Sequence, residues 1–101
     1  MYCVVITTCK KDDEKKIIDA LISSRLAACI NSWQVKSTYV WKGKIEEDEE
    51  YMLFIKTKKE KYKEVEEKIK SVHSYEVPEI ICFDIKEGNE SYLKWIDEVV
   101  K

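Results

Sequence analysis

The segment from Ala28 to Trp41 constrains the fold more than any other part of the sequence, because fourteen residues keep one alternating pattern. One face of the strand that this pattern predicts carries Trp33, Val35, Ser37, Tyr39 and Trp41. At about 3.3 Å per residue, such a strand would reach roughly 45 Å. A compact domain of about 100 residues is only about 34 Å across, so the strand must project beyond the domain, bend, or do both.

The following residues predict the hairpin partner of this strand. Residues 42–44 supply turn chemistry around a glycine, and residues 51–55 return as an apolar strand after the acidic run 46–50. The acidic run lacks the spaced oxygens and the glycine of a calcium loop, which favours a solvated hairpin arm. A projecting arm would expose strand edges and aromatic surface that monomers usually avoid. We therefore predict a homo-oligomer in which the arm pairs with a neighbour; the alternative is a bulge that folds the arm back onto its own sheet.

The rest of the chain alternates strands and helices. Residues 2–8 form a β-branched apolar run that predicts a central strand, and an acidic helix start at residues 12–14 leads into apolar residues at helical spacing. Thr57 and Glu60 have the spacing of a capping box and predict the start of a second helix, which ends at His73. Residues 77–85 predict the last strand, and Gly88-Asn89 is expected to end it and to cap a short terminal helix.

This order of elements predicts an α+β fold, a ferredoxin-like βαββαβ sandwich with a long β-hairpin and a C-terminal helix. One antiparallel sheet would have its helices on one face. Residues 1–101 are expected to form a single domain, because the length suits one core and neither a linker nor an internal repeat is visible.

Composition narrows the possible partners and the compartment. The net charge is −2 with both signs interleaved, which argues against binding to nucleic acid or to an anionic membrane. No apolar run approaches the roughly 20 residues of a membrane span, and residues 1–6 lack the features of a signal peptide. We therefore expect a cytoplasmic protein without direct membrane insertion. The four cysteines contain no CxxC pair and are expected to be reduced thiols, mostly buried.

The segment from His73 to Glu79 contains the only histidine and the only proline of the chain. His73 and Cys29 are the residue types that prefer soft or borderline transition metals, so they are the candidate metal ligands, with a structural role for His73 as the alternative. Their spacing does not say whether they meet. No phosphate-binding glycine loop, no environment for an activated thiolate and no RNA-binding strand motif are recognisable, so we predict no catalytic residue and no enzymatic activity.

Several separate segments of the chain match recurrent motifs of one family: Val5–Thr8, Arg25–Asn31, Tyr39–Ile45, Ile55–Thr57, His73–Ile80 and Tyr92–Trp95. With these motifs in order, the chain resembles the CutA divalent-cation-tolerance family from Val4 to about Trp95. The resemblance implies a ferredoxin-like fold assembled into a tight homotrimer, with the long strands paired between subunits. It also implies tolerance to copper and other divalent cations, without an established reaction. Copper(II) or another divalent metal ion would then be a ligand that is not tightly bound.

The implied trimer is also similar to that of the PII signalling proteins, which suggests a scaffold or sensor that binds a small anionic or polar molecule in a cleft between subunits. On that view the cleft would be lined by positions that match the family motifs: Trp41, Lys56, Tyr75 and Glu76, together with Cys29 and His73.

Three positions depart from the family pattern. Ser74 stands where many members have proline, Val72 precedes His73 where some members have two successive histidines, and Thr7 stands where some have a thiol. A copper site built from that thiol and the paired histidines would retain only His73 here.

Overall fold

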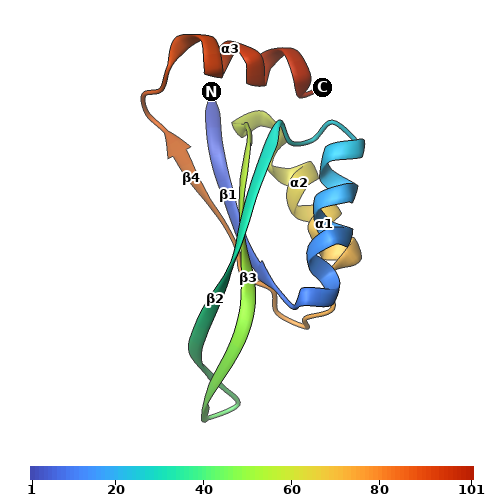
Figure 1. The fold of residues 1–101 in the computed structure, drawn as a ribbon, viewed down its shortest axis with the longest axis vertical. Helices are drawn as coiled ribbons and strands as arrows, with labels where there is room; N and C mark the ends of the chain where they lie inside the picture. Colours follow the sequence, from blue (N-terminus) through green and yellow to red (C-terminus); the bar gives the residue numbers. More distant parts are fainter.

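A computed structural model describes residues 1–101 and shows a four-stranded antiparallel sheet with three helices (Figure 1). The elements in chain order are β1 (Tyr2–Cys9), α1 (Lys11–Ser23), β2 (Cys29–Trp41), β3 (Lys44–Lys58), a 3-10 turn (Lys59–Lys61), α2 (Tyr62–Val72), β4 (Ile80–Ile85) and α3 (Glu90–Val99). The strand order is β2-β3-β1-β4, with α1 and α2 on one face of the sheet and α3 across one end of it. The predicted α+β, ferredoxin-like fold with a central β1 is confirmed.

The hydrophobic core lies between the sheet and helices α1 and α2. Because side chains alternate along a strand, every second residue of β1 and β3 points at these helices. The apolar residues of this core that are completely buried are Cys3, Val5, Cys9, Ile17, Leu21, Leu53, Ile55, Val65 and Ile69. All four cysteines are free, and Cys3 and Cys9 are completely buried, as predicted for reduced thiols.

The hairpin of β2 and β3 is paired along its whole length, from Cys29 opposite Lys56 to Trp41 opposite Lys44. Its tight turn holds Lys42 and Gly43 at φ values of 51° and 79°, and two consecutive positive φ values match the right-handed twist of a hairpin. The register continues without a bulge, so the arm projects beyond the helices and the molecule is 45 Å long (Figure 1). The predicted projection of the strand is confirmed, and the alternative of a folded-back arm is wrong.

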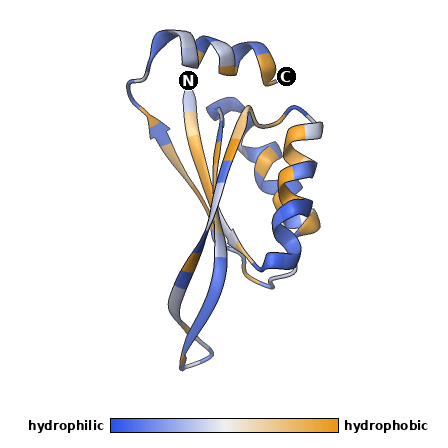
Figure 2. Cartoon of the chain, in the orientation of Figure 1, coloured by the Kyte–Doolittle hydropathy of each residue, from blue (hydrophilic) through white to orange (hydrophobic).

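The second face of the sheet has no helix over most of its length, because α3 contacts only one end of it, through the hydrogen bond from Tyr2 to Asp97. The strand registers place Trp33, Ile6, Ile81 and Phe83 on this face. Trp33 is 43% exposed, Ile81 41% and Phe83 56%. Parts of β1 and β4 have apolar colour in Figure 2. We call this surface the open face.

Two element boundaries differ from the sequence prediction. Thr57 does not cap a helix, because it is a buried residue of β3 whose Oγ1 donates a hydrogen bond to the Leu26 carbonyl oxygen at 2.6 Å. The second helix begins only at Tyr62, after the turn at residues 59–61. The last strand begins at Ile80 rather than at residue 77, and the residues before it form a loop that includes Pro78. The predicted cap at Asn89 is confirmed, because its side chain accepts a hydrogen bond from the Tyr92 amide.

Two threonines in the core give a matched test of buried polar contacts. Thr57 and Thr7 are both fully buried on neighbouring strands, but only Thr57 has a hydrogen-bond partner. Thr57→Val should lower the free energy of unfolding by about 1–3 kcal/mol, because it leaves the Leu26 carbonyl unsatisfied. Thr7→Val should leave stability unchanged or raise it, since no bond is lost. Urea unfolding at one fixed chain concentration checks both, and an equal loss in the two variants would contradict this account.

Candidate functional site

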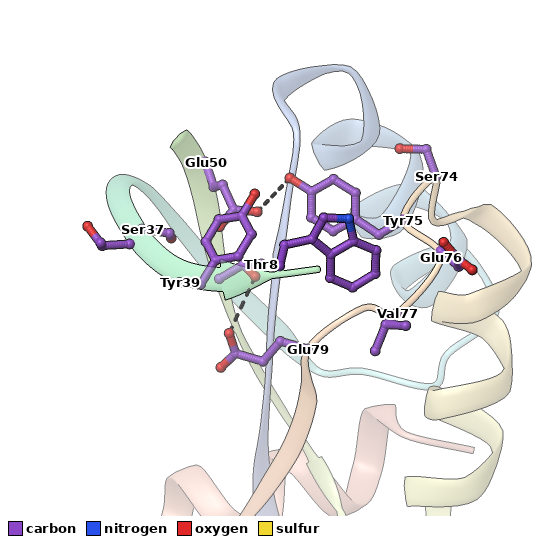
Figure 3. Close-up of a pocket in the computed structure, with 11 residues that line it drawn as sticks. Thr8, Ser37, Tyr39, Glu50, Ser74, Tyr75, Glu76, Val77 and Glu79 are labelled. Carbon is purple, nitrogen blue, oxygen red and sulfur yellow. Dashed lines mark hydrogen bonds between the residues drawn. The ribbon is translucent and has the colours of Figure 1, made fainter. Parts of the chain in front are cut away.

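A cavity of about 620 Å³ lies at the base of the hairpin arm, between β2, β3, the end of β1 and the loop before β4 (Figure 3). Its lining combines three carboxylates with three aromatic rings: Glu50, Glu76, Glu79, Tyr39, Trp41 and Tyr75. The aromatic rings of Tyr39 and Trp41 come from the alternating segment of β2, whereas Tyr75 and two of the carboxylates come from the loop. The local folding of the arm and of the loop therefore builds the site together.

The loop is anchored to α1 through a buried carboxylate. Asp13 is only 4% exposed, and its Oδ2 accepts hydrogen bonds from the Ser74 amide at 3.0 Å and from the Ser74 hydroxyl at 2.6 Å. Burial by itself would raise the pKa of Asp13, but these two hydrogen bonds outweigh it and lower the pKa below its ordinary value. The ionised carboxylate thus holds the loop next to the first turn of α1.

His73 fixes the other end of the same loop with both ring nitrogens. Its Nε2 lies 2.8 Å from the Thr8 carbonyl oxygen, and its Nδ1 accepts a hydrogen bond from the Tyr75 amide at 3.2 Å. A carbonyl oxygen can only accept, so the proton of the neutral ring must be on Nε2. Neither ring nitrogen has a free lone pair directed toward the solvent or toward the cavity.

A hydrogen bond between Tyr75 and Glu50 forms the inner wall of the cavity. The Tyr75 hydroxyl donates to Glu50 Oε2 at 2.6 Å, drawn as a dashed line in Figure 3. Burial and this bond to a carboxylate raise the pKa of Tyr75, so its hydroxyl keeps its proton at neutral pH. Tyr39 donates in the same way to Asp48, which raises the pKa of Tyr39 to about 12. Both phenols therefore act as hydrogen-bond donors to carboxylates.

The two remaining predicted site residues, Cys29 and Lys56, lie at the other end of the sheet. They face each other across β2 and β3, and the Asn31 side chain contacts both. Lys56 is also opposite Val4 of β1, whereas His73 contacts Thr8, about 13 Å further along that strand. Within one chain, Tyr75, Glu76 and Trp41 line the same cavity, and His73 packs against Tyr75 without lining it, but neither Cys29 nor Lys56 lies with them. No group of three or more His, Cys, Asp or Glu side chains is arranged to hold a metal ion.

Sequence reasoning missed Glu50 and Asp13 as site residues. Glu50 closes an acidic run, and composition alone predicts a solvated arm there. Glu50 is buried because the loop before β4 folds over it, and no local sequence pattern predicts this contact. The sequence predicts a helix start at Asp13, where an acidic residue is common. The proximity of Ser74 to Asp13 depends on tertiary structure.

The fold and this site define a class of small α+β proteins with a ferredoxin-like sheet, a projecting hairpin and a polar cavity beside an unclosed sheet face. The family model for CutA1 divalent ion tolerance protein matches residues 3–99. The chain therefore belongs to the CutA1 divalent ion tolerance family.

Individual relatives agree with this assignment. The divalent-cation tolerance protein CutA of Pyrococcus horikoshii is 40% identical over 101 residues, which covers 100% of this chain and 99% of that protein. The structure of the periplasmic divalent cation tolerance protein CutA from Archaeoglobus fulgidus matches with a TM-score of 0.97, 36% identity and full coverage of both chains. A CutA homolog of Xenopus laevis is 46% identical over 92% of this chain, and the chain spans only 63% of its length.

The Asp13–Ser74 contact makes a stability prediction with a defined pH dependence. At pH 7, Ser74→Ala should lower the free energy of unfolding by about 1.5 kcal/mol, the low end for a hydrogen bond to a charged group. Because the folded pKa of Asp13 is below 3.8, its stabilising contribution is present above that value and is lost as the pH falls through the folded pKa. The difference between wild type and variant should therefore shrink in acid.

Urea unfolding between pH 7 and pH 3 measures this difference. Ser71→Ala serves as the control, because the Ser71 hydroxyl donates at an exposed position to the Lys68 carbonyl oxygen, which does not titrate. A loss for Ser74→Ala that is the same at every pH would contradict the role assigned to Asp13.

Proposed function

We propose that this chain acts in divalent-cation tolerance as a non-catalytic homotrimer that binds divalent transition-metal ions, copper(II) foremost. The observation that carries the proposal is membership of the CutA1 divalent ion tolerance family over residues 3–99. The P. horikoshii and A. fulgidus relatives are both named as divalent-cation tolerance proteins.

The open face supports self-association. Phe83, Ile81 and Trp33 leave it apolar and uncovered, and an exposed apolar face of this kind usually marks an interface. Both outer strands, β2 and β4, also offer an unpaired edge. The resemblance noted from the sequence gives three as the number of copies.

The metal part of the proposal assigns His73 as the imidazole ligand. Since both its ring nitrogens are engaged within the chain, a metal ion must displace either the Thr8 carbonyl or the Tyr75 amide. One chain offers no group of three or more metal-binding side chains, so further ligands must come from another copy or from water. Cys29, half-buried at the far end of the sheet, is the thiol that a neighbouring copy could bring to His73.

The absence of catalysis is part of the proposal as well. The family names describe tolerance rather than a reaction. The thiol that follows Thr8 is a poor nucleophile, because burial raises the pKa of Cys9 to about 12. We place the protein in the cytoplasm, although the A. fulgidus relative is called periplasmic. None of the three helices has the length and apolar character needed to cross a bilayer.

A small-ligand sensor is the second candidate, and the cavity favours it. Trp41, Tyr75 and Glu76, three of the four predicted cleft residues, line this cavity. The fourth, Lys56, does not line the cavity, so no lysine is in place to bind an anionic ligand there.

Calorimetric titration with copper(II) and with redox-inert zinc(II) tests the metal assignment. His73→Ala should weaken binding at least about tenfold, because loss of an outer-shell partner alone already costs 10–100-fold in metal affinity. Cys29→Ala tests the thiol in the same way, and Cys82→Ala, at a half-buried position on β4, is the matched thiol control. An unchanged isotherm for His73→Ala would discard His73 as a ligand.

A further inference from the structure

Glu50 carries a buried carboxylate that no cation of its own chain neutralises. The residue is 5% exposed and lines the cavity. Its Oε2 accepts the hydrogen bond of Tyr75, while its Oε1 has no hydrogen-bond partner. None of the four ion pairs of the chain includes Glu50. The Glu50 Oε1 atom is not among the buried atoms that lack a partner, so it is open to the cavity and can accept a hydrogen bond from a bound cation.

The charge of the cavity as a whole is negative. Glu76 and Glu79 join Glu50 in the lining, which contains no lysine, arginine or histidine. Two ammonium groups lie over aromatic rings of the lining, with Lys10 Nζ at 6.0 Å from the Tyr75 ring centroid and Lys42 Nζ at 5.6 Å from that of Trp41. Both lysines are exposed, and neither forms an ion pair with a lining carboxylate. An anionic ligand would meet three carboxylates here and would lack the lysine that the sequence predicted for it.

The hydrogen-bonding groups suit a ligand that donates. The Tyr75 hydroxyl donates to Glu50, and the Thr8 hydroxyl donates to Glu79. The remaining carboxylate oxygens of the lining can only accept hydrogen bonds, so a ligand must supply the donors. A primary ammonium carries three N–H donors. The faces of Trp41 and Tyr75 can add cation–π attraction, and Val77 offers contact for an apolar tail. A volume of about 620 Å³ also lies within the range of small-molecule sites.

From these observations we propose that the cavity at the base of the hairpin binds a small primary alkylammonium ion, with the Glu50 carboxylate as its anchor. Glu79 is a second acceptor, the faces of Trp41 and Tyr75 attract the ammonium group, and Val77 contacts the alkyl chain. The site takes an organic cation rather than a metal ion, so it does not depend on the metal-binding role of His73.

The experiment uses a matched pair of probes on the full chain. n-Butylammonium and 1-butanol share the same alkyl chain, but one has a charged ammonium group and the other a neutral hydroxyl. The ratio of their dissociation constants therefore measures the contribution of the ammonium group. Calorimetry should show saturable binding of butylammonium at one site per chain, at least tenfold tighter than binding of 1-butanol. Butyltrimethylammonium, which has no N–H donors, should bind more weakly than butylammonium; equal affinity would overturn the assignment of a primary ammonium.

Glu50→Gln should weaken butylammonium binding at least tenfold, because it removes the charge and keeps an oxygen that can accept the Tyr75 bond. Glu98→Gln is the control, since it makes the same change in net charge at an exposed position of α3. Thermal melts would establish that both variants fold. Unchanged binding in Glu50→Gln, or equal binding of 1-butanol and butylammonium, would overturn the proposal.

A lysine side chain of another copy could supply the same ammonium group. Butylammonium binding to the wild-type protein distinguishes a free small molecule from such a lysine. If the wild-type protein binds no butylammonium while Glu50→Gln changes its oligomeric mass, the carboxylate serves an interface and the proposal is overturned. None of these results changes the outcome of the zinc titration of His73→Ala, so the two proposals fail independently.

Discussion

The rest of the structure depends on one constraint: both crossover helices of the four-stranded sheet lie on the same face. α1 connects β1 to β2, and α2 connects β3 to β4. Such crossover connections are right-handed, so the two helices cover the same face and leave the other one open. The third helix, α3, covers only one end of this open face and leaves the rest of it uncovered. The Tyr2 hydroxyl donates to Asp97, and the Lys101 amide donates to the Arg25 carbonyl oxygen.

The same constraint explains where the candidate site lies. Beyond the helices, the side chains of the arm on the open-face side have no core to enter, and Tyr39 and Trp41 turn toward the loop before β4 instead. Asp13 and His73 hold that loop in place through backbone and side-chain hydrogen bonds. The acidic cavity thus lies at one end of the open face, and the Cys29–Lys56 pair lies at the other. A neighbouring copy that covers the face can bring groups from opposite ends together, which a single chain cannot do.

Local sequence patterns were sufficient for the parts of the fold that depend on local chemistry. The alternation of residues 28–41 predicted both the strand and its projection, and Asn89 was recognised as a helix cap from its position. Tertiary contacts overrode local patterns elsewhere. Thr57 has the spacing of a capping box, but burial beside Leu26 gives its hydroxyl a different acceptor. Glu50 belongs to an acidic run, but the loop from His73 to Glu79 folds over it and turns a solvated charge into a buried one.

Tertiary structure also explains the separation of Cys29 from His73. The strand register decides at which end of the sheet a residue lies, and the spacing of residues in the sequence does not reveal that register. For that reason the sequence predicted the candidate ligands one by one but not their arrangement.

The central claim is that other copies of the chain cover the open face, and sedimentation equilibrium of the full chain tests it most directly. The account predicts a single species at three times the chain mass of 12.0 kDa, unchanged on dilution through the micromolar range. A stable species with the mass of one chain would contradict it, because Phe83, Ile81 and Trp33 would then face water in the native state.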